Sequence, residues 1–116
     1  MPAPDDALLC SAYRAAASHV EVLADGYVVQ GLGTQHGPSG EHEGFLLRLR
    51  SGCALVVRVE TNIAFTGPIP LHDGEYVTVK GEYEYDAGGG VLHWTHRAFR
   101  SHHASGYVEA AGRLYW

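Results

Sequence analysis

Residues 75–85 read Glu-Tyr-Val-Thr-Val-Lys-Gly-Glu-Tyr-Glu-Tyr, and residues 91–95, after a glycine-rich stretch at 86–90, read Val-Leu-His-Trp-Thr. Apolar and polar side chains alternate in the first run, which predicts a strand with one face on a protein core. Three consecutive glycines at 88–90 indicate a turn. We therefore expect a hairpin whose short second strand carries residues 91–95.

Three other runs of β-forming residues precede this hairpin. Residues 20–32 predict a long first strand. Residues 45–50 and 54–60 predict a second hairpin over the turn at Ser51 and Gly52. Alternating leucines and valines in this hairpin again define one apolar face.

Two segments between the strands are predicted as loops. Residues 33–44 are rich in glycine and polar side chains and are long enough to carry a function. Residues 61–70 contain Pro68 and Pro70, which exclude a regular helix or a central strand there.

The remaining segments complete a single domain over residues 1–116. An aspartate near the start can cap a helix over residues 5–18, whose apolar side chains form one narrow stripe. Strands occupy residues 20–95, and residues 96–116 are expected to form a histidine-bearing loop and a C-terminal hairpin. One helix followed by five main strands predicts an all-β chain with one N-terminal helix. We interpret it as a small antiparallel five-stranded barrel of the OB type.

The charge balance limits the classes of partner. The chain has 116 residues, a formal net charge of -5 and a single lysine, Lys80. Phosphate backbones are bound mainly by lysine and arginine, so nucleic acid is disfavoured as a partner, although a local arginine patch would still allow it. No stretch is long and apolar enough to span a membrane. Because no signal peptide opens the sequence, we expect a cytoplasmic protein; a periplasmic or exported one is the alternative if a signal has been removed.

The two cysteines, Cys10 and Cys53, fit no zinc-binding spacing. We expect two small buried apolar residues, with a disulfide as the alternative for an exported chain.

Four of the eight histidines lie within eleven residues, which is the strongest functional signal in the chain. Imidazole is the commonest side-chain metal ligand and the usual acid–base group near neutral pH. A zinc site of three histidines and a water would take His93, His96 and His103, with His42 as a fourth candidate. Residues three apart on a straight strand face opposite sides, so this site requires the chain to turn directly behind Thr95.

Such a site suggests a reaction class. Zinc-activated water would hydrolyse a small ester or phosphoester, with His93, His96 and Thr95 as candidate catalytic residues. The structural alternative is that these histidines only bond to backbone carbonyls at strand ends.

Two non-catalytic functions also remain open. An OB module could bind an oligonucleotide or a saccharide through aromatic and basic side chains, for which the candidates are Trp94, Arg48, Arg58 and Tyr107. A structural or interaction domain without a ligand is the third hypothesis.

Residues 89–96 read Gly-Gly-Val-Leu-His-Trp-Thr-His; they follow Gly-Glu-Tyr-Glu-Tyr at 81–85 and precede His103, Gly106 and Tyr107. This pattern resembles a bacterial family of domains of unknown function, number 3465, and the likeness extends over residues 20–116. The resemblance implies a small OB-like domain without an established activity, many of whose relatives look exported.

The chain departs from this family pattern directly after the His-Trp-Thr-His tetrad. It has Arg97, Ala98 and Phe99 where the family tends to have a further histidine and then Asp-Pro. A role for an acidic residue at that point is therefore in doubt.

Overall fold

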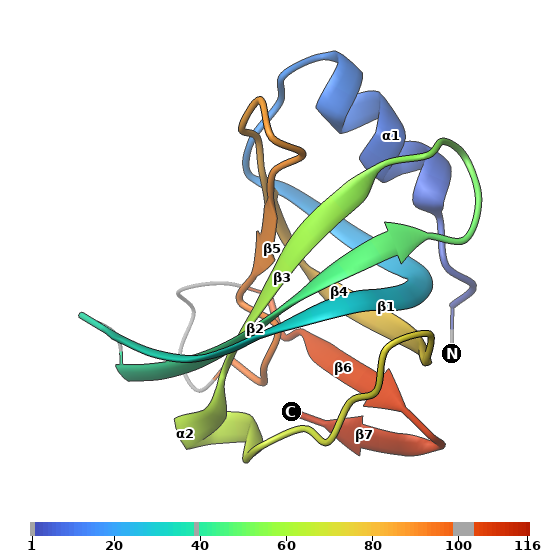
Figure 1. Cartoon of the computed structure of the whole chain (residues 1–116). Coiled ribbons are helices and arrows are strands. Elements are labelled where there is room, and N and C mark those ends of the chain that lie inside the picture. Colours follow the sequence, from blue (N-terminus) through green and yellow to red (C-terminus); the bar gives the residue numbers. More distant parts are fainter. Residues whose placement is uncertain (1, 39, 99–103) are drawn as a thin grey trace.

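The structure is a computed structural model that describes residues 2–38, 40–98 and 104–116. The described chain is mostly β-structure with one short N-terminal helix, as predicted (Figure 1). Its elements, in order, are α1 (Asp6–Arg14), β1 (Val20–Gly37), β2 (Gly40–Leu49), β3 (Val56–Asn62), α2 (Ile63–Thr66), β4 (Tyr76–Glu84), β5 (Val91–His93), β6 (Tyr107–Ala110) and β7 (Arg113–Tyr115).

Five of these strands close into a ring, in the order β1-β2-β3-β5-β4 and back to β1. The C-terminal hairpin of β6 and β7 extends from β4 and adds to the five strands of the ring, which gives seven strands in the sheet. The prediction of a wholly antiparallel sheet is also wrong, because β5 runs parallel to β3. Strand β4 pairs with β1 instead of β3, so the short return strand β5 fills the space between β4 and β3.

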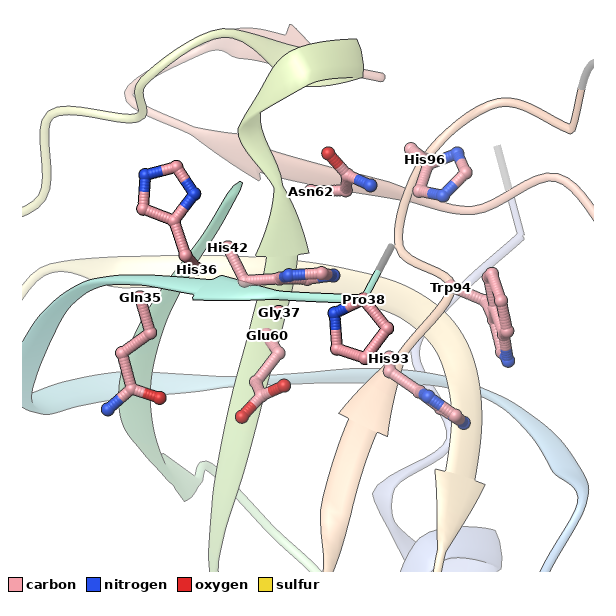
Figure 2. Close-up of a pocket in the computed structure, with 10 residues that line it drawn as sticks. All are labelled: Gln35, His36, Gly37, Pro38, His42, Glu60, Asn62, His93, Trp94 and His96. Atoms are coloured by element: carbon pink, nitrogen blue, oxygen red, sulfur yellow. The ribbon is translucent and has the colours of Figure 1, made fainter. Parts of the chain in front are cut away.

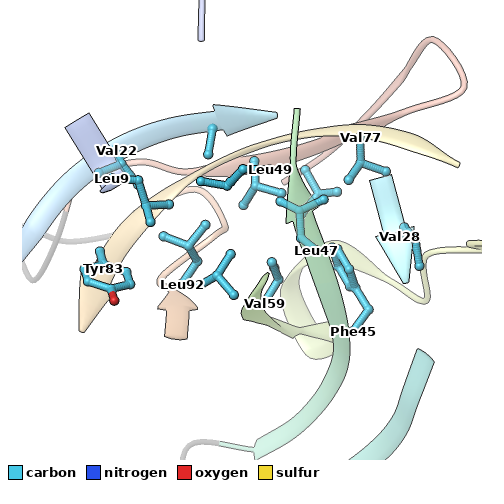
Figure 3. Close-up of a cluster of buried hydrophobic side chains, with 14 of the residues drawn as sticks. Leu9, Val22, Val28, Phe45, Leu47, Leu49, Val59, Val77, Tyr83 and Leu92 are labelled. Atoms are coloured by element: carbon cyan, nitrogen blue, oxygen red, sulfur yellow. The ribbon is translucent and has the colours of Figure 1, made fainter. Parts of the chain in front are cut away.

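The alternation seen in the sequence sets the core. Phe45 and Leu47 of β2, Val59 of β3 and Val77 of β4 all bury their side chains inside the ring (Figure 3). Leu9 of α1 is completely buried, so the helix covers part of this core as it packs against β1.

Helix α1 begins where the sequence predicts and ends earlier. The Asp5 side chain accepts a hydrogen bond from the backbone N–H of Leu8 at 3.1 Å and caps the first turn. The helix ends at Arg14 rather than Ser18 because Ala16 has φ 52°. The N–H of Ala16 bonds to Tyr13 and that of Ala17 to Ala12, a pairing that closes a helix C-terminus even without glycine.

The glycine-rich segment 33–44 is not a loop. β1 and β2 continue through it as a long hairpin arm, which projects from the ring at the left of Figure 1. Within the arm Thr34 pairs with Glu43, and His36 with Glu41. Cross-strand contacts of this kind hold a sheet together where intrinsic strand preference is weak.

The proline-containing segment 61–70 also differs from its prediction as a loop. Asn62 accepts a hydrogen bond from the N–H of Ala64 at 3.1 Å and caps the single helical turn α2. The turn ends at Gly67, with φ 72°, directly before Pro68, so proline excludes the helix only beyond that point.

Cys10 and Cys53 form a disulfide, so the expectation of two separate apolar cysteines is wrong. Their Cα atoms are 6.2 Å apart, and the bond links α1 to the turn between β2 and β3. Gly52 lets the two segments meet, since a Cβ there would lie 3.1 Å from the Cys10 sulfur. In the described part of the chain no helix has the length and apolar character needed to cross a bilayer.

Candidate functional site: a pocket lined by histidines

The backbone leaves the sheet inside the His-Trp-Thr-His tetrad, two residues before the predicted end of the strand at Thr95. Strand β5 ends at His93, and Trp94 has φ 54°. The left-handed region costs a non-glycine residue about 1–2 kcal/mol, and it persists only where the surroundings impose it. The strain therefore marks this bend as a place that the rest of the fold holds in position.

Two glycines on neighbouring segments make room for the bend. A Cβ on Gly81 would lie 2.6 Å from the carbonyl oxygen of His93, and one on Gly106 would lie 2.4 Å from that of Trp94. The N–H of Gly106 also donates to the carbonyl of His96 at 2.8 Å. Side chains at these positions would displace the tetrad.

A hydrogen bond from Tyr83 holds the glycine turn before β5 in place. Its buried hydroxyl donates to the carbonyl of Gly89 at 2.8 Å, and burial raises the pKa of Tyr83 to about 12. The Asp86 carboxylate accepts hydrogen bonds from the N–H groups of Gly88 and Gly90 at 2.8 and 3.0 Å. The turn thus positions β5 between β4 and β3, and it has the role of a hairpin turn that the sequence predicts.

A pocket of about 260 Å³ lies between the tip of the arm, the end of β3 and the bend after β5 (Figure 2). Its lining combines imidazole rings, amides, one carboxylate and one indole. These residues are Gln35, His36, Gly37, Pro38, His42, Glu60, Asn62, His93, Trp94 and His96. A smaller hollow of about 160 Å³ shares Gln35, His42 and Glu60 with the pocket and adds Arg58.

Two of the predicted histidines, His42 and His96, face this pocket with the same ring nitrogen tied to the backbone. Nδ1 of His42 is 3.1 Å from the carbonyl oxygen of Gly40, and Nδ1 of His96 is 2.9 Å from that of Arg97. His96 is buried, and its ring stacks on Phe65 with centroids 4.5 Å apart. A proton held on Nδ1 by a carbonyl leaves Nε2 as the acceptor nitrogen of a neutral imidazole.

His93 lies at the pocket edge, and its ring points away from those of His42 and His96 (Figure 2). Nε2 of His93 is 3.5 Å from Glu84 Oε1 and 3.7 Å from Glu82 Oε2. His103 lies outside the described residues. Among the described residues, the pocket histidines do not bring three donor atoms within 4.8 Å of one another.

The remaining tetrad residues have different environments. Trp94 lines the pocket and is 38% exposed. Thr95 is fully buried, and its hydroxyl donates to the carbonyl of Glu60 at 3.0 Å, which is a structural role. Tyr107 of β6 is opposite Lys80 of β4 and is not among the residues that line the pocket.

Arg48 and Arg58 lie on the same outer face of the β2–β3 hairpin, since Leu46 is opposite Arg58 and Arg48 is opposite Val56. The Arg48 guanidinium lies 5.7 Å from the centre of the Tyr27 ring. Arg58 pairs with Glu60, with Nε and Oε1 3.2 Å apart. Arg58 is thus the one of the two that borders a hollow next to the histidines.

Sequence reasoning missed several pocket residues. Gln35 and His36 were predicted in a loop, and Asn62 in the proline-containing segment. The direction of their side chains could therefore not be predicted. The pairing of the arm supplies the missing register: His42 is opposite both Gln35 on β1 and Asn62 on β3.

Residues 2–116 match the sequence model of a family described as Protein of unknown function (DUF3465). The chain belongs to this family. No match was found among curated proteins or among solved structures. The match to DUF3465 covers the helix α1 and its disulfide cysteine as well as the strands, which extends the likeness beyond residues 20–116. In this DUF3465 protein, the tetrad His-Trp-Thr-His therefore sits at a strained bend beside a polar pocket.

Proposed function

We propose that this DUF3465 protein binds a small anionic molecule, through a phosphate or carboxylate group, in the histidine-lined pocket. The observation that carries the proposal is the convergence of donor groups in one concavity. The amides of Gln35 and Asn62 and the imidazoles of His36 and His42 all line it. Concave sites with a few converging polar groups are the usual places for small ligands.

The charges around the pocket favour an anion. Glu60 is the one carboxylate among its lining residues, and Arg58 pairs with it at 3.2 Å. The Asn62 carbonyl oxygen accepts from the N–H of Ala64, and the amide nitrogen at the other end of this side chain is a donor. A protonated imidazole donates through both ring nitrogens, so a ring whose Nδ1 is bonded to a carbonyl can also donate from Nε2.

The size of the pocket and its indole wall limit the ligand. A volume of about 260 Å³ lies just below the range of about 300–1,000 Å³ typical of ligand pockets, so the ligand is small. Trp94 offers a partly exposed ring face at the edge, held by the strained backbone. We therefore expect an anionic group deep in the pocket and an apolar or planar part against Trp94.

The closed ring supports our further proposal of an OB-like fold. Its order, β1-β2-β3-β5-β4, combines a bent first strand with a parallel β3–β5 contact. OB domains bind ligands on the face of their second and third strands and at the loop between the first two. The pocket draws its residues from that region, His42 from β2 and Glu60 from β3.

Fluorescence of Trp94 provides the test. In a Trp116→Phe background, titration with inorganic phosphate and with acetate should change the emission, and the stronger ligand identifies the anion class. His42→Ala should weaken binding at least fivefold. His72→Ala is the matched control, since His72 is exposed and is not among the residues that line the pocket. Absence of binding by both anions, or equal affinity in His42→Ala, would refute the proposal.

Hydrolysis of a small ester or phosphoester in this pocket stays a prediction. It would be tested by incubating zinc-loaded protein with a nitrophenyl ester and a nitrophenyl phosphate. Turnover by the wild type that His96→Ala lacks is the expected result, and turnover unchanged in that variant would contradict it.

The disulfide supports a further proposal about compartment. Structural disulfides persist in oxidising surroundings and are rare where glutathione keeps thiols reduced. We infer that the chain works in an oxidising compartment, and free-thiol titration of the protein in its native cells would test this. Reduced Cys10 and Cys53 would contradict it.

A further inference from the structure

We propose that His19, Glu82, Glu84 and His93 form a binding site for a divalent transition-metal ion, best suited to zinc. The site lies on the outer face of the sheet, beyond the pocket edge. It goes beyond the anion site proposed above and does not depend on it.

Strand pairing brings these four side chains together. Glu82 and Glu84 are two residues apart on β4 and so point to the same face. His93 on β5 is directly opposite Glu82. On the other side of β4, β1 begins at Val20, opposite Tyr83, so His19 lies at the entrance to that strand.

The donor atoms of His19, Glu82 and Glu84 all lie within 4.8 Å of one another, and His93 approaches the same two carboxylates. Nδ1 of His19 is 2.9 Å from Glu84 Oε1 and 3.4 Å from Glu82 Oε2. Nε2 of His93 is 3.5 Å and 3.7 Å from the same two oxygens. In a tetrahedral zinc site with bonds of about 2.1 Å, the ligand atoms are about 3.4 Å from one another. The observed separations cluster around that value.

The segment that carries His19 is held in place rather than free. Ser18 accepts a hydrogen bond from the N–H of Tyr85 at 2.9 Å, which ties the chain to the end of β4. His19 itself has φ 61°, a conformation that a non-glycine residue adopts only when its surroundings impose it. The strained backbone thereby keeps the imidazole over the two carboxylates.

The environment of the His93 ring is a second observation that favours a bound metal ion. Its Nε2 atom is buried and makes no hydrogen bond, although it lies between the carboxylates of Glu82 and Glu84. A buried ring nitrogen that makes no hydrogen bond is costly, and a metal ion shared with the two carboxylates would satisfy it. The nitrogen therefore fits a ligand better than a packing role.

The chemistry of the donors selects the class of ion. Two imidazole nitrogens with two carboxylate oxygens suit zinc and its first-row neighbours, whereas calcium and magnesium prefer oxygen ligands alone. The ion would sit beside the wall of the pocket, because His93 belongs to both sites.

The test uses the full chain, purified without a histidine tag and freed of metal. Calorimetric titration with zinc should give one ion per chain, and cobalt should give the visible absorption bands of a tetrahedral site. Glu84→Gln and His19→Ala should each lower zinc affinity at least tenfold, while His72→Ala and His42→Ala should leave it unchanged. His19 is mostly exposed, so its variant keeps the test valid even if Glu84→Gln folds poorly.

Each other outcome overturns the proposal. Failure of the wild type to bind zinc refutes it directly. Zinc affinity that falls in His42→Ala but stays unchanged in His19→Ala moves the ion to the pocket. The phosphate titration is a separate measurement, so loss of one site leaves the other open to support.

Discussion

His93 and Glu82 face each other across the β4–β5 pair, with Nε2 and Oε2 3.7 Å apart. Because of this pairing, the two histidines of the His-Trp-Thr-His tetrad have different environments. One of its histidines turns to the carboxylates of β4, and the other, His96, packs on Phe65 beside the pocket. The bend at Trp94 between them separates the two environments.

Gly106→Ala should disrupt this arrangement. The new Cβ would lie 2.4 Å from the carbonyl oxygen of Trp94 and 2.5 Å from that of Lys80, and both are backbone atoms. We expect a loss of about 2–3 kcal/mol in the free energy of unfolding, of the size that overpacking produces. Gly31→Ala is the matched control, because nothing lies within 4 Å of its Cβ. Urea denaturation of both variants measures the difference, and equal stability would contradict the close packing of the tetrad.

Tyr83→Phe should loosen the glycine turn. The substitution removes the hydrogen bond to Gly89 and leaves that buried carbonyl without its donor. We expect a loss of about 1–2 kcal/mol. Because the turn positions β5, the same variant should also alter the NMR signals of His93. Tyr85→Phe, one residue beyond the end of β4 and exposed, is the control that should change neither.

Removal of the disulfide should lower the free energy of unfolding more than Gly106→Ala or Tyr83→Phe does. Cys10 and Cys53 are 43 residues apart, and closing a loop of that length stabilises the fold by about 4 kcal/mol in the chain-entropy description. The double Cys→Ala variant should therefore melt about 15 °C below the oxidised wild type. A reductant should lower the melting temperature of the wild type and leave that of the variant alone. An unchanged wild type with fully titrated thiols would contradict the prediction.

Asp6 and Asp25 predict an unusual pH dependence of stability. Both are buried, and Asp6 accepts from the N–H of Asp25 at 2.9 Å. Burial, together with hydrogen bonding to Asp25, raises the pKa of Asp6 above its ordinary 3.8. Burial opposes the shift at Asp25, but hydrogen bonds from Tyr76, Asp6 and Arg50 lower its pKa.

These two shifts act on stability in opposite directions. Above pH 3.8 the folded state holds the Asp6 proton more tightly than the unfolded state, so this contribution is lost as pH rises through the folded pKa. The Asp25 contribution is instead lost as pH falls through its own lowered pKa. In urea denaturation from acid to neutral pH, wild-type stability should fall relative to Asp6→Asn as pH rises. Parallel profiles for the two proteins would contradict the raised pKa of Asp6.

The strands that bury one face were predictable, because alternation along β2 and β4 records which side meets the core. The hairpin arm was not, since glycine and polar side chains indicate a loop and only the partner strand makes them a sheet. The parallel contact of β5 with β3 was not predictable either. These strands are separated in the chain by α2 and β4, so no local pattern shows that they pair.

The site could be predicted only in part. Histidine spacing indicated His93 and His96, with His42 as a further candidate from the segment 33–44, and all three line the pocket. Their directions were not predictable, because the alternation rule ends where Trp94 leaves the strand. His19 has no motif around it, and its position over Glu84 follows from the pairing of β1 with β4.

Diffraction from crystals grown with zinc, recorded at the zinc absorption edge, tests the division of the tetrad most directly. One anomalous peak should appear within bonding distance of His19, His93 and the carboxylates of Glu82 and Glu84. A peak between His42 and His96, or no peak beside Glu84, would contradict the account.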